Sequence, residues 1–298
     1  MMIVEHFIYD DSAKTWNLYP FGDLQFGASG FREDLWNTFK NDVLKDRDAL
    51  TVGCGDYTDL FRPTIQGRFE GALAGNKDAA IQLEDLHKDH MHKIIDKLKT
   101  VVRKDNCLGL LGGHHDMDYR SGITSTQYLC ENLGVKYLGR SAIILVKFRP
   151  RSYFRNLGKH GTSKVLKIHA QHGSGGSSYV SSDLANLERK TMPYYNADIY
   201  LRGHSTKKSI AKTIEYDASE GSPPYLIERE KVLINTGGFM SGYEEGTGAS
   251  YVEKQNMAPA SLGWVKLAIK INDTTHNKRN LKTGHKQLKA FEFYPTMY

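Results

Sequence analysis

Apolar, strand-like runs along this chain repeatedly end in turns where a carboxylate or an imidazole is flanked by glycine. Five such turns read FGD (21–23), GCGD (53–56), GGHHD (112–116), QHG (171–173) and RGH (202–204). In an open α/β sheet, ligands bind beyond the carboxyl ends of the strands, where polar side chains from several strands meet. Glycine lets the backbone turn sharply enough to direct those side chains inward. The turns therefore predict a sheet edge at which Asp and His side chains gather.

Strand-like and helix-like segments alternate early in the chain, and strands dominate later, which predicts a single α/β domain over residues 1–298. Helical spacing of apolar residues predicts helices at 31–45, 83–101, 125–135 and 182–192. Apolar or alternating runs predict strands at 3–9, 16–19, 49–53, 107–111, 141–148, 164–171, 197–202, 231–236, 265–271 and 286–295.

Local turn chemistry refines this assignment. The segment DDSAK separates the first two predicted strands, 3–9 and 16–19, and favours a hairpin between them. Ser182 is expected to cap the last predicted helix, and Gly134 lies where the third helix should end.

Composition narrows the class of protein. The chain of 298 residues has a formal charge of +6 and a pI near 9.0, which favours anionic partners such as phosphates or nucleic acid. Its three cysteines show no C-x-x-C spacing, which is typical of a reduced compartment. The N-terminus lacks a basic start and a long apolar stretch, and no run of about 18 apolar residues occurs. We therefore expect a cytoplasmic protein of a bacterial or phage-infected cell, without membrane contact.

The order of the five turns resembles the calcineurin-like metallophosphoesterases, whose blocks are D-x-H, G-D-x-x-D/N, G-N-H-D/E, a lone His and G-H-x-H. Here they read DLQ (23–25), GDYTD (55–59), GHHD (113–116), His172 and GHST (203–206). The stretches HGSGG, ADIYLRGH and GGFMSGYEEG look especially like small phage and prophage members. The resemblance implies a four-layer α-β-β-α sandwich of two mixed sheets.

The resemblance also implies a binuclear metal centre with an altered first site. The second metal would be bound by Asp56, His114, His172 and His204. The first would keep Asp23 and Asp56, but the positions of two family histidines are occupied by Gln25 and Thr206, which are weaker neutral donors. We therefore expect one tightly held divalent ion, drawn from Mn, Zn, Fe or Mg, and a weaker second.

The activity implied is hydrolysis of phosphoesters, as a phosphodiesterase or phosphatase, by a metal-activated hydroxide. His115 would donate a proton to the leaving oxygen, Asp116 would orient it, and Asp59 would brace the loop. The substrate class stays open, with nucleic acid or nucleotides as candidates.

Alternatives remain at this point. A degenerate relative would bind metal, phosphate or nucleic acid with little catalysis, as the changes at Gln25 and Thr206 suggest. His169 competes with His172 as a ligand, but three residues along a strand reverse the facing, so His169 should point away. His87 and His90 could share a metal on a helix, although a solvated helix face is the simpler interpretation. The segment GSGGSS (173–178) fits a rim of the metal cleft, and the basic run 149–164 fits either a nucleic-acid guide or an exposed loop.

Overall fold

The computed structural model describes residues 2–9, 15–60, 77–149, 163–175, 179, 181–218, 220, 224, 226–243, 251–254, 258–271, 278–279, 286–287 and 290–298. Its helices are α1 (Glu33–Lys45), α3 (Lys77–Leu98), α4 (Ser125–Leu133), α5 (Ser182–Lys190) and α6 (Tyr251–Lys254). Its strands are β1 (Ile3–Tyr9), β2 (Thr15–Phe21), β3 (Ala49–Gly53), β4 (Cys107–Leu110), β5 (Ser141–Phe148), β6 (Lys164–Gln171), β7 (Ile199–Arg202), β8 (Lys208–Ala218), β9 (Leu226–Thr236), β10 (Val265–Ile271), β11 (Lys278–Arg279), β12 (Lys286–Gln287) and β13 (Phe291–Met297).

Two mixed sheets form the centre of the described structure. The larger has the order β1-β5-β6-β7-β9-β8 and the smaller β13-β10-β2-β3-β4. Parallel pairs β6–β7 and β7–β9 in the first sheet, and β2–β3 and β3–β4 in the second, give each a set of strands ending at a common edge. Antiparallel pairs such as β8–β9 and β10–β13 complete the sheets.

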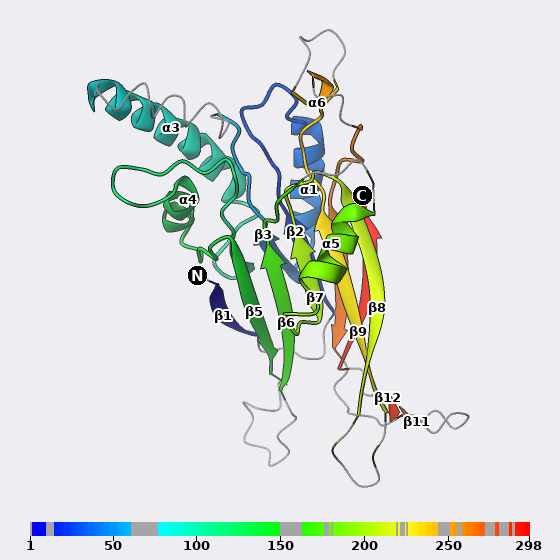
Figure 1. The fold of residues 1–298 in the computed structure, drawn as a ribbon. Coiled ribbons are helices and arrows are strands. Elements are labelled where there is room, and N and C mark those ends of the chain that lie inside the picture. Colours follow the sequence, from blue (N-terminus) through cyan, green and yellow to red (C-terminus); the bar gives the residue numbers. More distant parts are fainter. Residues whose placement is uncertain are drawn as a thin grey trace.

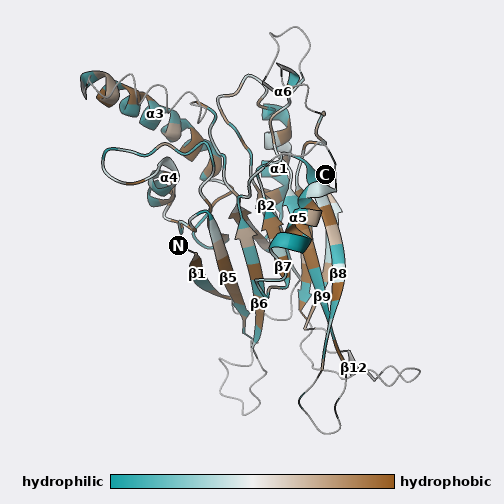
Figure 2. Ribbon diagram, in the orientation of Figure 1, coloured by the Kyte–Doolittle hydropathy of each residue, from teal (hydrophilic) through white to brown (hydrophobic). Residues whose placement is uncertain are grey.

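The core has three parts that correspond to the contacts between four layers. The inward faces of both sheets meet in one apolar cluster, with Leu18 and Val52 from one sheet and Ile144 and Leu201 from the other. On its outer face, the smaller sheet packs against α1, α3 and α4. The outer face of the larger sheet packs against α5. Figure 1 shows α5 over one sheet with α1 beyond the other, and Figure 2 shows hydrophobic residues concentrated along the strands. The predicted α-β-β-α sandwich is confirmed.

Sequence signals explain the helices. Trp36, Phe39 and Val43 recur at helical spacing and are the buried residues of α1. A capping box begins α4, because Thr124 accepts from the Gln127 amide while the Gln127 side chain accepts from the Thr124 amide. Gly134 ends that helix in the left-handed conformation, with φ of 67°. The predicted helices are confirmed, with α3 starting earlier than expected.

Two local predictions are wrong, and one strand was not predicted. The hairpin of the first two strands does not form, because β1 pairs with β5 in the larger sheet and β2 with β3 and β10 in the smaller. Ser182 is the first residue of α5, and its hydroxyl donates to the Tyr179 carbonyl instead of capping the helix. Strand β8 went unpredicted, because it is an edge strand that pairs with β9 and leaves half its side chains exposed.

Candidate metal centre

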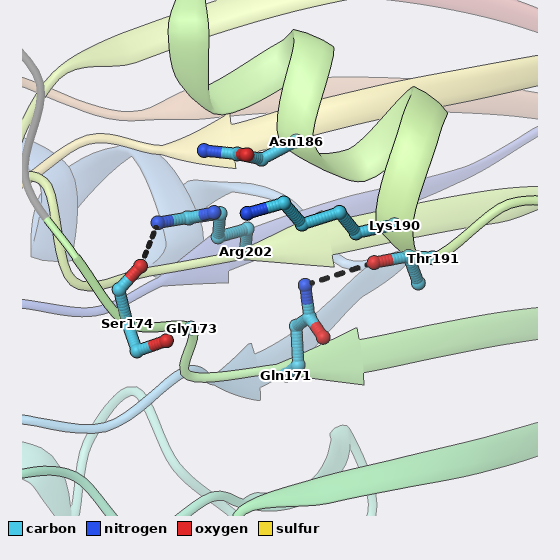
Figure 3. Close-up of a pocket in the computed structure, with 7 residues that line it drawn as sticks. All are labelled: Gln171, Gly173, Ser174, Asn186, Lys190, Thr191 and Arg202. Carbon is cyan, nitrogen blue, oxygen red and sulfur yellow. Dashed lines mark hydrogen bonds between the residues drawn. The ribbon is translucent and has the colours of Figure 1, made fainter.

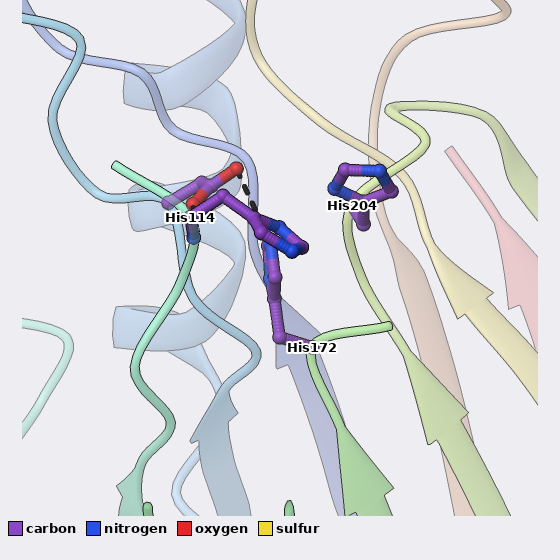
Figure 4. A group of neighbouring side chains, drawn as sticks. His114, His172 and His204 are labelled. Carbon is purple, nitrogen blue, oxygen red and sulfur yellow. Dashed lines mark hydrogen bonds and ion pairs between the residues drawn. The ribbon is translucent and has the colours of Figure 1, made fainter. Parts of the chain in front are cut away.

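The five predicted turns converge at one edge of the two sheets. Asp23 follows β2 and Asp56 follows β3, while His114, His172 and His204 follow β4, β6 and β7. One potential ligand atom from each of Asp56, His114, His172 and His204 lies within 4.8 Å of the others. Figure 4 shows the three imidazoles, carried by separate strand ends, turned toward a common point. The parallel strands bring these residues together, although His204 and Asp56 are 148 positions apart in the sequence.

The donor atoms of this group are suited to a metal. The His172 Nδ1 atom lies 2.7 Å from the Cys54 carbonyl, to which it can donate, and its Nε2 atom lies 3.3 Å from Asp56 Oδ2. A backbone partner on the other ring nitrogen is the usual way in which a ligating His is oriented. Among the described residues, no hydrogen bond reaches the buried atoms His114 Nδ1 or His204 Nδ1. Buried polar atoms are rarely left without a partner, so this set fits a divalent ion.

The protonation states of this group also suit metal binding. Burial, followed by the neighbouring His172, lowers the pKa of His114, and burial lowers the pKa of His204 to about 4. Both rings are therefore neutral near pH 7, as metal ligation requires. Burial acts against charging of the Asp56–His172 pair, but their mutual attraction prevails: it lowers the pKa of Asp56 and raises that of His172 to about 9. A metal ion could replace the His172 proton as the positive partner of Asp56.

Asp23 adds a second carboxylate beside this group. Its Oδ2 atom accepts a hydrogen bond from the His204 backbone amide at 2.7 Å, whereas its Oδ1 atom has no partner among the described residues. Burial and the adjacent Asp56 raise the pKa of Asp23 to about 7. Two buried carboxylates this close repel each other unless a proton or a cation lies nearby. The pair therefore favours a cation on the Asp23 side as well.

Backbone strain coincides with the predicted ligands. Among the described residues, the non-glycine residues with positive φ are Asp23, Gln25, Asp56, His204 and Thr206, with values of 47–74°. All five belong to the seven metal residues predicted from the sequence. Such conformations cost free energy and persist at functional sites, where the surroundings enforce them. The strain supports a functional role for these turns.

Gln25 and Thr206 lie in the turns that carry Asp23 and His204. Gln25 is buried, and its backbone N–H donates to the Asp56 backbone carbonyl at 3.0 Å. Thr206 and Asp23 both approach Gly238, where an added Cβ would lie 3.1 Å from each. Thr206 therefore lies near Asp23, and Gln25 lies two residues after it; a weakened first site at these positions stays a prediction.

His115 faces a different carboxylate from the one expected. Its Nδ1 atom lies 2.9 Å from Asp59 Oδ1, and its Nε2 atom lies 3.8 Å from Asp56 Oδ2. Asp116 instead accepts from the Thr126 hydroxyl at 2.5 Å and from the Gly113 amide at 3.2 Å, so it holds the turn against the start of α4. The expected pairing of Asp116 with His115 is wrong, because the turn after β4 directs consecutive side chains apart. The spacing G-D-x-x-D was the signal that could have identified Asp59.

The other histidines have separate partners. His169 points away from the metal group, as predicted, and stacks on Tyr195 with ring centroids 4.5 Å apart. His87 Nδ1 lies 2.9 Å from the Tyr119 hydroxyl and His90 Nε2 lies 3.0 Å from the Phe26 carbonyl. The two α3 histidines therefore attach the helix to neighbouring loops instead of sharing a metal. The predicted solvated helix face is wrong for His87, which is fully buried.

Several further predictions concern other parts of the chain. Residues 176–178 of GSGGSS and 150–162 of the basic run lie outside the described residues. The cysteines Cys54, Cys107 and Cys130 are all buried and free, which is typical of cysteines that pack as small apolar residues. In the part of the chain that the structure describes, no helix is both long and apolar enough to cross a membrane.

Neither a protein-family model nor a curated protein sequence matches this chain. Solved structures with a similar fold include Vps29 from Chaetomium thermophilum, at 12% identity and a TM-score of 0.38, covering 95% of this chain and 96% of that one. A predicted phosphoesterase from Streptococcus pneumoniae TIGR4 aligns at 9% identity with a TM-score of 0.34. The alignment covers 95% of this chain and 99% of that one. The calcineurin-like phosphoesterase YfkN from Bacillus subtilis aligns at 8% identity with a TM-score of 0.32. The alignment covers 95% of this chain and 90% of that one. Because these scores and identities are low, the functional interpretation rests on the side chains of the site.

Proposed function

We propose that residues 1–298 form one metal-dependent phosphoester hydrolase domain, acting as a phosphodiesterase or phosphatase. The observation that carries the proposal is the buried group of Asp56, His114, His172 and His204, whose donor atoms lie within 4.8 Å of one another. A bound divalent ion of the Mn, Zn, Fe or Mg class would lower the pKa of water and neutralise charge on phosphate oxygens. The likeness to phage members, a cytoplasmic location and a nucleic-acid substrate stay predictions.

The chain's own residues would divide the work as follows. Asp56, His114, His172 and His204 would hold the tight ion, and Asp23 with Gln25 and Thr206 would complete a weaker site. Asp56 is fixed for this role because its Oδ1 atom accepts from the backbone amides of His114 and His115, at 2.7 and 3.1 Å. Its Oδ2 atom is left to face the imidazoles.

His115 would supply the proton that the leaving oxygen needs. Burial lowers its pKa, but pairing with Asp59 outweighs burial and raises that pKa above the usual value. If Asp59 accepts from Nδ1–H, the Nε2–H bond points toward the Asp56 side of the site, where a substrate would lie. The ring would therefore hold its proton more strongly than a free imidazole does, and it would present that proton at Nε2. Asp59 is proposed as the positioning residue, and Asp116 as the residue that holds the loop.

A metal-supplemented assay tests the activity. Chelated protein is mixed with each divalent metal and with bis-p-nitrophenyl or mono-p-nitrophenyl phosphate, and p-nitrophenol release is followed. We expect metal-dependent turnover of at least one ester. Metal binding without turnover would favour the degenerate alternative, and a salt-dependent shift of labelled DNA in that inactive protein would favour a nucleic-acid-binding role. Failure to bind any of the metals would contradict the proposal as a whole.

The weakened first site yields a gain-of-function prediction. The double change Gln25→His and Thr206→His should add a second bound ion per chain, because imidazole binds Mn²⁺, Fe²⁺ and Zn²⁺ better than an amide or hydroxyl does. Histidine also tolerates positive φ better than most residues, so the strained backbone at both positions should accept it. Calorimetric titration with Mn²⁺ counts the sites, and diester turnover should rise with the second ion.

The single changes serve as controls for the double one. Each should do less than the pair, because both new ligands would belong to one ion. Two sites of comparable affinity in the unaltered protein would instead mean that Gln25 and Thr206 already serve an ion, and that the first site is not weakened.

A further inference from the structure

A second polar site lies next to the metal centre, between α5 and the ends of β6 and β7. It is a pocket of about 200 Å³. Its lining residues are Gln171, Gly173, Ser174, Asn186, Lys190, Thr191 and Arg202. All of these except glycine carry polar side chains, and the two that are charged are cations (Figure 3). This composition suits an anion.

Arg202 forms the inner wall of the pocket. Its side chain is 4% exposed, and its terminal nitrogen donates to the Ser174 carbonyl at 2.7 Å and lies 3.4 Å from Asp183. The buried Nε–H has no hydrogen-bond partner among the described residues. The Gly173 loop covers this Nε–H, so the guanidinium offers a bound anion its positive charge, which the Asp183 carboxylate at 3.4 Å offsets in part.

Two α5 side chains approach Arg202 from the opposite wall. Asn186 and Lys190, one helical turn apart, both extend from α5 toward the guanidinium (Figure 3). Lys190 is exposed and makes no ion pair within the described part of the chain. A planar fork from one side and an ammonium from the other suit phosphate, which has several terminal oxygens to share between them.

The chain connects this pocket directly to the metal centre. Gly173 follows His172, and Arg202 precedes His204 by two residues. Gly173 has φ of +93°, and a Cβ added there would lie 2.9 Å from Arg202 Nε, so only glycine lets the loop pass over the guanidinium. The Gly173 turn therefore lies between the pocket, which is on the α5 face of the larger sheet, and the metal group at the edge of the two sheets.

We propose that the pocket between α5 and the ends of β6 and β7 binds a second phosphate group of the substrate, distinct from the one that is hydrolysed. This inference rests on the proposed phosphoesterase function and specifies its substrate class as a compound with at least two phosphates. The volume of about 200 Å³ is below the roughly 300–1,000 Å³ of pockets for drug-sized ligands. It therefore has room for a phosphate group, with the rest of the substrate extending outside the pocket.

Equilibrium binding tests the proposal without requiring turnover. Calorimetry compares thymidine 3′,5′-bisphosphate with thymidine 5′-monophosphate on the purified full-length protein. We expect the bisphosphate to bind about tenfold more tightly, as one charge-assisted contact of about 1.4 kcal/mol would give. Lys190→Gln should abolish that difference, and Asn186→Asp, which puts a carboxylate in the pocket, should do the same.

Arg189→Gln is the matched control, because Arg189 is the exposed neighbour of Lys190 on α5 and does not line the pocket. It removes the same charge and should keep the tenfold preference. Equal binding of the two nucleotides by the unaltered protein would overturn the proposal. An equal loss in Arg189→Gln and Lys190→Gln would do so too, because it would indicate general surface charge.

A tetrathymidylate identifies the source of the second phosphate. If its affinity also falls in Lys190→Gln, the pocket binds a backbone phosphate of a polynucleotide; if only the bisphosphate responds, it binds a terminal phosphate of a nucleotide. Failure of the two proposals can be distinguished. A protein without turnover that keeps the Lys190-dependent preference contradicts the hydrolase function alone, and an active protein without the preference contradicts the pocket alone.

Discussion

His115→Ala is expected to slow hydrolysis of a diester with a sugar alkoxide leaving group by about 10²-fold or more, the usual contribution of a general acid. The same change should affect a p-nitrophenyl ester much less, because p-nitrophenolate is a good leaving group and needs little protonation. Metal content should stay at the level of the unaltered protein, since His114 and not His115 lies in the group of four donors. Turnover of both esters, measured beside metal analysis of the same samples, checks all three expectations.

The two neighbouring carboxylates provide the comparison for this prediction. Asp59→Asn should reproduce the selective loss with the alkoxide leaving group, because Asp59 lies 2.9 Å from His115 Nδ1 and raises the pKa of that ring. Asp116→Asn should weaken contacts with Thr126 and Gly113, and so affect stability more than leaving-group selectivity.

Two outcomes would contradict the assignment of His115. If His115→Ala is purified without metal, the roles of the adjacent histidines are reversed. If Asp116→Asn and not Asp59→Asn shows the selective loss, the proton donor is oriented by the carboxylate that the sequence suggested first.

His172→Ala is expected to lose the tightly held ion, with an affinity decrease larger than the roughly 10–100-fold typical of changes to residues that only support a ligand. The ring is 2% exposed and its Nε2 atom lies 3.3 Å from Asp56 Oδ2, so its removal takes away one of four donors at the centre of the group. Competition between the protein and a chromogenic chelator measures the affinity for Zn²⁺ or Mn²⁺.

His169→Ala is the matched control for this second prediction. His169 is a buried histidine on β6, three residues before His172, but it stacks on Tyr195 on the other side of the sheet. Both variants lose an imidazole from the interior, so both should unfold at a lower denaturant concentration. Only His172→Ala should lose the metal; loss in His169→Ala with retention in His172→Ala would show that the ligand was chosen wrongly.

Local patterns were sufficient for much of the fold and the site. Helical spacing located α1, α3 and α4, and alternation located β10, because these periodicities follow from backbone geometry and do not depend on distant contacts. The same reasoning placed His169 and His172 on opposite faces of one strand. Asp or His flanked by glycine marked the turns where the metal group gathers, because the carboxyl ends of parallel strands share an edge.

Only the tertiary structure decided features that depend on contacts between distant segments. The strands 3–9 and 15–21 belong to different sheets, because backbone pairing with β5 and β3 prevailed over the turn chemistry between them. His115 contacts Asp59, and Asp116 contacts Thr126 instead. In a turn, the backbone dihedral angles decide where each side chain points, and the sequence alone does not specify those angles. The Arg202 pocket likewise exists only because α5 packs over the ends of two strands, and no local periodicity encodes that packing.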